Sequence, residues 1–396
     1  MLHDDACLKC SLCITACPVV RVDPLFAGPK AYGPEWWRAH EARDAFDTDP
    51  HVDDCTFCQL CEAACPADVP VAHLIAQHKD HHRKRRPQLK RFRDFILSHP
   101  HWIGRLPFSP QKVPAVVAKM VQMSSHADFP VADRTKFHSG RPYGENIPTV
   151  GLFVDCFNRS YGGEVVAAAE RVISRLGYQA VLMPSQPHCC GAAAYASGLV
   201  DEAQRIAQDS AHALRETPVE TLLTLNATCD GTLRDEWPKY FSLSLPGTRV
   251  LPWTDWVLET ATADFWSQFE ETNEAVWVHT TCRGKVAQGE GAMEEFVKLA
   301  NGQPLPLGIA CCGAAGSYAF KVEHEDAAIQ LGIKAKEAVH RQGHQAEAMI
   351  VDSGTCALHL AQYTGLFTMH PALWLGRRLM QAQSLDKKAE VSNLCE

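Results

Sequence analysis

The pentapeptide Cys189-Cys190-Gly191-Ala192-Ala193 occurs a second time, unchanged, as Cys311-Cys312-Gly313-Ala314-Ala315. Adjacent side chains on an extended backbone point in opposite directions, so a Cys-Cys-Gly sequence needs a sharp turn to aim both sulfurs at one site. The glycine permits a backbone shape or a close approach that a side chain would block. The repeated pentapeptide therefore predicts an internal duplication with the same turn in each half.

Strand and helix patterns alternate in the same order around both pentapeptides. The expected strands are 150–154 and 221–225 in the first half, and 275–278 and 348–351 in the second half. The expected helices that follow the pentapeptides are 200–214 and 327–339. Strands alternating with helices of this length predict βαβ units and parallel sheets. We place the two α/β repeats at residues 149–272 and 273–396.

Each half also contains two outlying cysteines, one after its first strand and one after its last. The predicted cofactor-binding cysteines are Cys156, Cys189, Cys190 and Cys229 in the first half, and Cys282, Cys311, Cys312 and Cys356 in the second. Cysteine is a common buried residue. Burial alone, however, does not explain an adjacent pair that recurs with matching outlying cysteines, so we predict a cofactor site in the repeats.

The N-terminal region contains a different cysteine motif, again in two copies. The pattern C-x2-C-x2-C-x3-C-P is formed by Cys7, Cys10, Cys13 and Cys17, and again by Cys55, Cys58, Cys61 and Cys65. In two-cluster ferredoxins the fourth cysteine of each run binds the other cluster. We therefore assign one 4Fe-4S cluster to Cys7, Cys10, Cys13 and Cys65, and a second to Cys55, Cys58, Cys61 and Cys17. The spacing is not the usual one for structural zinc, and no C-x-x-C pair is followed by the histidine of a c-type haem site.

The predicted fold class is thus mixed, with an α-helical two-cluster ferredoxin-like domain at residues 1–75 followed by the duplicated α/β Cys-Cys-Gly domain. The 396 residues are 46% apolar, enough for a large core, and the formal net charge of −8 argues against nucleic acid as a partner. A disulfide framework is the alternative use of 17 cysteines. It would need an oxidising compartment, whereas the N-terminus lacks a signal-peptide pattern, so we expect a cytoplasmic protein.

Residues 76–148 are expected to form a basic and amphipathic linker. A basic run between Lys79 and Arg93 overlaps an apolar set: Phe92, Phe95, Ile96, Trp102, Ile103, Leu106, Phe108, Val113, Val116, Val117 and Met120. Such a segment can lie in the interface of an anionic membrane. It can equally pack its apolar face on the protein or on a partner subunit. The sequence leaves both interpretations open.

The chain resembles the Cys-Cys-Gly subunit of heterodisulfide reductase and its relatives, which include iron-sulfur subunits of glycolate oxidase and of lactate utilisation. Its likeness to the iron-sulfur subunits of anaerobic glycerol-3-phosphate dehydrogenases covers almost the whole length. The resemblance rests on the twin Cys-Cys-Gly motif and on the stretches Cys17–Pro24, Gly28–Lys30, Arg86-Pro87, Leu97–His99, His279–Cys282 and His370-Pro371. It implies a flavin-free protein, peripheral on the inner face of the cell membrane, that passes electrons from an FAD-containing dehydrogenase partner to membrane quinone.

One departure from the heterodisulfide-reductase pattern affects the cofactor. That pattern ends each half in C-x-x-C and supports a non-cubane cluster, whereas Asn226 and Ser353 replace the first cysteine of the pair here. Four cysteines per half suffice for an ordinary cubane. We therefore expect one or two further iron-sulfur clusters in the repeats, held through iron by the eight cysteines named above.

Two functions follow from these features. The first is an electron-transfer subunit of anaerobic respiration, with no catalytic residue of its own, serving a dehydrogenase for glycerol-3-phosphate or a 2-hydroxy acid. A string of clusters suits this task because flavins deliver electron pairs that clusters carry singly. The second is a catalytic subunit that reduces a disulfide at a Cys-Cys-Gly cluster. The chain has no G-x-G-x-x-G and no P-loop, so no nucleotide site is expected in it.

Overall fold

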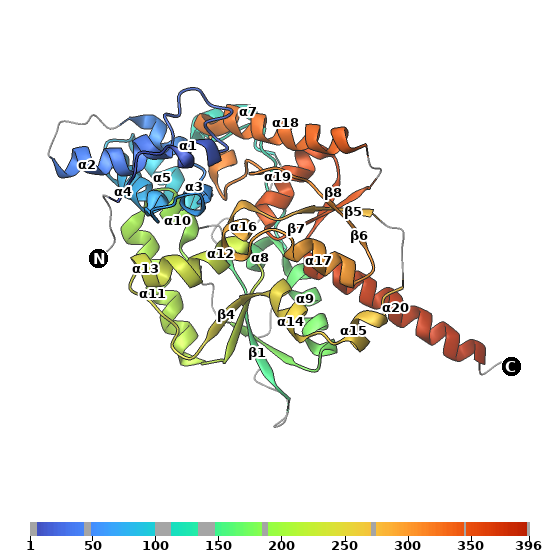
Figure 1. The fold of residues 1–396 in the computed structure, drawn as a ribbon. Coiled ribbons are helices and arrows are strands. Elements are labelled where there is room, and N and C mark those ends of the chain that lie inside the picture. The colour runs from blue at the N-terminus through green and yellow to red at the C-terminus, as the bar shows by residue number, and fades with distance from the viewer. Residues whose placement is uncertain are drawn as a thin grey trace.

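The computed structural model describes residues 6–42, 49–99, 112–133, 147–183, 189–270, 275–343 and 346–393. Figure 1 shows the N-terminal module (blue) packed beside two sheet-containing repeats, the first in green and yellow and the second in orange and red. None of the helices in these described segments combines the length and hydropathy needed to cross a lipid bilayer.

The N-terminal module is built from short helices around the two cysteine runs. Its elements are α1 (Leu12–Ala16), the π-helical η1 (Ala31–Glu35), α2 (Trp36–Glu41), the 3-10 helix η2 (Pro50–Asp54), α3 (Leu60–Ala63) and α4 (Val71–Arg83). Val19, Val52, Leu74 and Ile75 are buried at its centre, beside Cys17 and Cys61. The apolar core of this module is therefore continuous with its cysteines.

The linker after the module forms α5 (Gln88–Leu97) and α7 (Ala115–Val121). A proline stands at the N-terminal boundary of each, Pro87 and Pro114, where its missing N–H costs no helical hydrogen bond. Of the apolar set expected here, Trp102, Ile103, Leu106 and Phe108 lie outside the described residues.

Part of the basic run is internal, which the sequence interpretation did not anticipate. The buried carboxylate of Asp94 lies 2.7 Å from Arg86 Nη1, 2.8 Å from Arg93 Nη2 and 3.2 Å from Lys321 Nζ. Burial opposes ionisation of Asp94, but the charges of Lys321, Arg93 and Arg86 outweigh it and hold its pKa well below the usual range. Arg93 also pairs with Glu323. These ion pairs join the linker to the second repeat.

The first repeat contains a four-stranded parallel sheet in the order β2-β1-β3-β4. The strands are β1 (Thr149–Phe153), β2 (Gln179–Met183), β3 (Thr221–Thr224) and β4 (Arg249–Pro252). The helices are α8 (Cys156–Tyr161), α9 (Gly163–Arg175), α10 (Ala192–Ala196), α11 (Val200–Glu216), α12 (Ala227–Gly231), the π-helical η3 (Thr232–Glu236), α13 (Trp237–Tyr240), α14 (Trp253–Thr260) and α15 (Ala263–Ser267).

The second repeat reproduces this topology with the strand order β6-β5-β7-β8, again all parallel. Its strands are β5 (Ala275–His279), β6 (Gln303–Pro306), β7 (Ala348–Val351) and β8 (Phe367–Met369). Its helices are α16 (Cys282–Gln288), α17 (Ala292–Leu299), the 3-10 helices η4 (Tyr318–Phe320) and η5 (Val322–His324), α18 (Glu325–Gln342), α19 (Gly354–Thr364) and α20 (Pro371–Asn393). The mixed fold with two parallel sheets is the predicted one.

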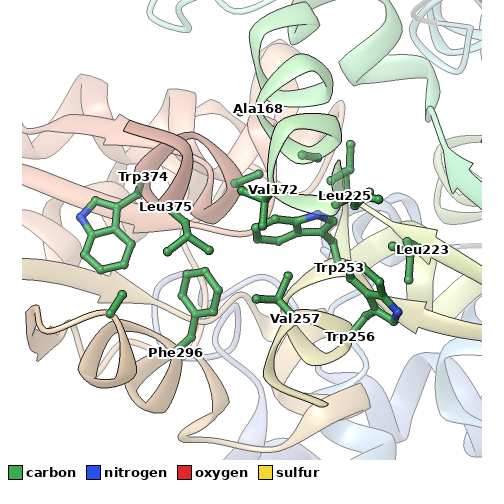
Figure 2. Close-up of a cluster of buried hydrophobic side chains, with 14 of the residues drawn as sticks. Ala168, Val172, Leu223, Leu225, Trp253, Trp256, Val257, Phe296, Trp374 and Leu375 are labelled. Atoms are coloured by element: carbon green, nitrogen blue, oxygen red, sulfur yellow. The ribbon is translucent and has the colours of Figure 1, made fainter. Parts of the chain in front are cut away.

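The two repeats share one hydrophobic core. Figure 2 shows Val172 and Trp253 of the first repeat close to Phe296 and Leu375 of the second. The rings of Trp253 and Phe296 meet edge to face with centroids 6.0 Å apart. Helix α20 packs against α9, where a Cβ added to Gly376 would lie 3.3 Å from Ala168 Cβ. The repeats are therefore mutually dependent for burial of their apolar surface.

Candidate functional site

The two N-terminal cysteine runs fold into loops with the same backbone. In each loop the residues on either side of the second cysteine have positive φ: Lys9 and Ser11 flank Cys10, and Phe57 and Gln59 flank Cys58. Residues other than glycine adopt this conformation uncommonly. The matching pair of left-handed residues curls each loop so that its cysteines share one centre.

The structure brings the N-terminal cysteines together in the crossed arrangement expected from the sequence. Cys7, Cys10, Cys13 and Cys65 line one small cavity. Cys17 instead lies near Cys55, Cys58 and Cys61. Burial and the neighbouring thiols raise the pKa of Cys17 to about 12. That these two sets bind the clusters stays a proposal.

In the first repeat, four cysteines meet where β1 and β3 end. Cys156 begins α8 directly after β1, Cys189 and Cys190 precede α10, and Cys229 lies in α12 after β3. The Sγ atoms of Cys156 and Cys189 are 3.5 Å apart, and those of Cys190 and Cys229 are 3.3 Å apart. Ligand sites in parallel sheets form at the carboxyl ends of the strands. The first predicted Cys-Cys-Gly set is therefore assembled at such an edge.

The second repeat assembles its cysteines in the same way. Cys282 begins α16 after β5, Cys356 lies in α19 after β7, and Cys311 and Cys312 lie between β6 and η4. Cys311 neighbours Cys282, and Cys312 neighbours Cys356. The pKa values of the Cys311 and Cys312 thiols are raised well above the usual value through their thiol neighbours and burial. The duplicated sequence thus produces a duplicated thiol site.

The glycine of each Cys-Cys-Gly motif is required by the backbone. Gly191 and Gly313 have φ values of 92° and 93°. A Cβ on Gly191 would lie 2.7 Å from the carbonyl oxygen of Ala203, and one on Gly313 would lie 2.9 Å from Leu331 Cβ. Both the turn and the close helix behind it exclude a side chain.

Several backbone amides point at sulfur. Gly191 N–H donates to Cys189 Sγ at 3.5 Å, Gly313 N–H to Cys311 Sγ at 3.4 Å, and Phe57 N–H to Cys55 Sγ at 3.4 Å. The described cysteines are all free thiols. Burial and crowding disfavour the thiolate form of a cysteine unless a positive charge lies nearby, and iron would supply that charge. Amide donors to sulfur are also a feature of iron-sulfur sites. The residues therefore fit iron-sulfur clusters, which bind cysteine as thiolate.

The two repeat sites have different neighbours, which the sequence did not reveal. A cavity of about 120 Å³ is lined by Cys55 together with Cys282, Cys311, Cys312 and Cys356. The second repeat site thus lies directly against the Cys55–Cys61 loop. The first repeat site instead borders an apolar cavity of about 440 Å³ that reaches α5. The second repeat site therefore lies beside Cys55, and the first repeat site lies beside the apolar cavity. Phe57 of the Cys55–Cys61 loop also packs in the buried cluster that contains Cys189 and Cys190.

A buried polar link joins the three parts of the chain beside these sites. Arg283 Nη1 lies 2.9 Å from Glu236 Oε1, and Gln59 Nε2 donates to the same oxygen at 2.6 Å. Nearby, burial and the charge of Glu236 raise the pKa of Glu62 to about 7. The backbone amide of Ala72, which donates a hydrogen bond to this carboxylate, has the opposite but smaller effect. One signal for this link is present in the sequence, since Gln59 and Arg283 each adjoin a predicted cysteine ligand.

Comparison with known families agrees with this geometry. Residues 4–69 match the 4Fe-4S dicluster domain, and residues 150–234 and 276–361 each match the cysteine-rich domain. The predicted ferredoxin-like domain followed by a duplicated Cys-Cys-Gly domain is therefore confirmed.

Three relatives illustrate the range of proteins that share these domains. The C subunit of anaerobic glycerol-3-phosphate dehydrogenase from Escherichia coli K12 is 29% identical, over 94% of this chain and 98% of its own length. Lactate utilization protein A from an Exiguobacterium species is 23% identical, over 54% of this chain and 89% of the relative. The B subunit of a Methanothermobacter marburgensis fumarate reductase (CoM/CoB) is 24% identical, over 57% of this chain and 45% of the relative. The predicted resemblance to the glycerol-3-phosphate dehydrogenase component is confirmed.

A solved structure shares the overall fold. A hypothetical protein from Helicobacter pylori superposes with a TM-score of 0.51 at 10% identity, covering 92% of this chain and 71% of that one. At this identity the similarity concerns the fold alone.

Proposed function

We propose that this chain, which carries a 4Fe-4S dicluster domain and two cysteine-rich domains, transfers electrons from an FAD-containing dehydrogenase to membrane quinone. The observation that carries the proposal is the presence of four cysteine sets in one molecule, of which one includes the exposed Cys10 and another borders an apolar cavity. Iron-sulfur clusters bound at these sets supply single-electron transfer, which matches a flavin donor of electron pairs.

The surface around Cys10 suits a protein partner. Leu8 and Leu12 flank Cys10, and both are exposed. An exposed apolar rim beside a redox site is a surface on which a partner protein can dock. The printed name of the Escherichia coli relative points to a dehydrogenase of glycerol-3-phosphate, and that of the Exiguobacterium relative to lactate, a 2-hydroxy acid. We propose a flavin-containing dehydrogenase of one of these substrates on this surface.

A second surface, on the linker helices, suits a membrane. Phe92 of α5 and Val116 and Met120 of α7 are 64%, 74% and 70% exposed. The exposed bases Lys84, Arg85, Arg91 and Lys119 lie in the same segment. Apolar side chains with nearby bases attract a helix to the interface of an anionic bilayer. We propose peripheral contact there with the inner face of the membrane, where quinone accepts two electrons and two protons from water to become quinol.

A disulfide reductase is the second candidate, because the apolar cavity is lined by cysteines of the first repeat site, where a disulfide substrate would reach them.

The test of the proposal is anaerobic purification of the chain with its partner, with iron counting and reductive titration followed by electron paramagnetic resonance. About 16 irons per chain support four cubanes, and about eight restrict the clusters to the N-terminal domain. Substrate-dependent reduction of a short-chain quinone supports the proposal. Turnover of a disulfide by the isolated chain, without membranes, contradicts it, as does an active protein without iron.

A further inference from the structure

The apolar cavity of about 440 Å³ lies between the linker helices and the first repeat site. Its outer wall includes Leu89, Phe92 and Ile96 of α5, and its inner wall includes Cys156, Cys189 and Cys229. This volume is within the ~300–1,000 Å³ usual for small-molecule sites. Because Leu89 and Phe92 are also exposed, the apolar lining is continuous with the surface proposed above for membrane contact.

Besides hydroxyl groups such as that of Thr228, the lining contains one side-chain amide next to the cysteines, that of Asn226. Asn226 Oδ1 accepts the amide hydrogen of Thr228 at 3.0 Å and so caps α12, the helix that carries Cys229. This bond fixes the side-chain amide, and no described residue accepts a hydrogen bond from its Nδ2. The corresponding Ser353 makes no such cap in the second repeat. The amide donor is therefore peculiar to the first repeat site.

The charges in the lining favour a neutral ligand over an anionic one. The cation of the described lining is Arg93, whose guanidinium is already bound by Asp94 and Glu323. Asp155 adds a buried carboxylate that caps α8. A disulfide substrate with carboxylate or sulfonate groups finds no uncommitted cation among these described residues. A neutral planar ring with carbonyl oxygens suits the apolar walls and the single amide donor.

We propose that this cavity binds the head group of a quinone, with Asn226 Nδ2 donating to a ring carbonyl oxygen and the isoprenoid tail leaving between Leu89 and Phe92. The inference rests on the proposed function and names the place of quinone within this chain. It also gives the two repeat sites different roles, since the cysteines of the first line the proposed quinone cavity and those of the second lie beside Cys55.

The test uses the purified complex with its dehydrogenase partner, in detergent and without air. Menaquinone-1 binding is measured by quenching of tryptophan fluorescence, and reduction of menaquinone-1 and of ferricyanide is measured in parallel. Serine is a favoured N-cap residue, so Asn226→Ser keeps an oxygen that can cap α12 but removes the side-chain amide. We expect its dissociation constant to rise about three- to tenfold, the effect of one lost hydrogen bond.

A second variant fills the cavity. Ile96→Trp should raise the dissociation constant of menaquinone-1 more than tenfold and slow its reduction, with ferricyanide reduction unchanged. The matched control is Val131→Trp, which adds the same ring at an exposed position outside the described lining and should leave binding as in the unaltered protein. If both cavity variants bind menaquinone-1 normally while ferricyanide and quinone are reduced, the cavity assignment is wrong and the proposed function survives. If the dehydrogenase substrate reduces neither acceptor, the proposed function itself fails.

Discussion

At the scale of single residues, the Cys-Cys-Gly turn depends on the absence of a Cβ atom at its glycine. Gly191 faces the carbonyl of Ala203, and this contact is with backbone, which cannot rotate away as a side chain can. The sequence predicted the need for glycine from the Cys-Cys-Gly pattern alone. It could not predict which helix approaches the turn, because α11 is positioned by packing rather than by local spacing.

Gly191→Ala should therefore destabilise the protein by about 2 kcal/mol or more, since left-handed strain and a backbone clash add together. It should also lower the iron content of the first repeat. The control is Gly343→Ala, which has φ of 64° but open space around its Cβ, and which should cost only about 1 kcal/mol. Thermal unfolding and iron per chain measure both effects. Equal losses for the two variants would show that strain alone matters.

Lys79 gives a second prediction at this scale. Its buried ammonium donates to Cys55 O at 2.8 Å and to Ala196 O at 3.0 Å, so a positive charge lies beside the proposed Cys55 cluster. Positive charge favours the reduced state, and Lys79→Met should lower that cluster's reduction potential by about 50–100 mV, as Coulomb's law gives for a charge several Å away at intermediate dielectric. Exposed Lys84→Met should change the potential little. Reductive titration followed by electron paramagnetic resonance measures the reduction potential. An unshifted potential in Lys79→Met would contradict the placement of a cluster beside Lys79.

At the scale of elements, the linker shows where sequence patterns reach their limit. The sequence predicted a basic and amphipathic segment at residues 76–148, yet Arg93 of this segment is buried against Glu323, a residue 230 positions away. Local spacing carries no information about such a distant acid. The exposed face of the same segment remains amphipathic, so the membrane interpretation now rests on α7 and on part of α5.

Val116→Ser with Met120→Ser should weaken binding to phosphatidylglycerol vesicles at least tenfold, because each exposed apolar side chain contributes about 1.5–3 kcal/mol when buried in lipid. Leu25→Ser removes an equally exposed leucine from the N-terminal module and should bind vesicles normally. Co-sedimentation measures the binding. Equal binding by all three proteins would favour a partner protein on this face.

The buried carboxylate of Asp94 holds α5 to the second repeat through Lys321. Asp94→Ala removes the carboxylate that Arg86, Arg93 and Lys321 share. Arg86 keeps Asp53 and Arg93 keeps Glu323, whereas the buried ammonium of Lys321 loses its salt bridge. The variant should therefore lower the free energy of unfolding by about 3–5 kcal/mol. Asp209 forms an exposed pair with Arg205, so Asp209→Ala should cost at most about 0.5 kcal/mol. Thermal unfolding of the two variants provides the comparison, and a similar small change in both would mean that the network is solvated.

At the scale of the whole molecule, we expect the repeats to unfold as one cooperative body, because they share a hydrophobic core. The duplication, both parallel sheets and the grouping of the cysteines followed from sequence motifs, because spacing and strand ends fix them. The neighbour of each cysteine site did not follow, because repeats with the same motifs carry no mark of which one faces the N-terminal module. That difference arises from docking, through residues such as Gln59, Glu236 and Arg283.

Leu375 tests this cooperation. It is fully buried in the shared core although it belongs to the second repeat. Leu375→Ala should cost about 2–5 kcal/mol and should speed amide hydrogen exchange in α9 of the first repeat. Met380→Ala, on the exposed side of α20, should change exchange little. If exchange rises in the second repeat only, the repeats unfold independently.

Helix α20 also fixes an order of events during synthesis. It follows all of the described cysteines along the chain, yet it completes the core around α9. A ribosome therefore delivers every one of these cysteines before the helix that completes this core has emerged. Iron and sulfide supplied at that stage would meet a chain whose interior is still accessible, because the shared core forms only after α20 has packed on α9.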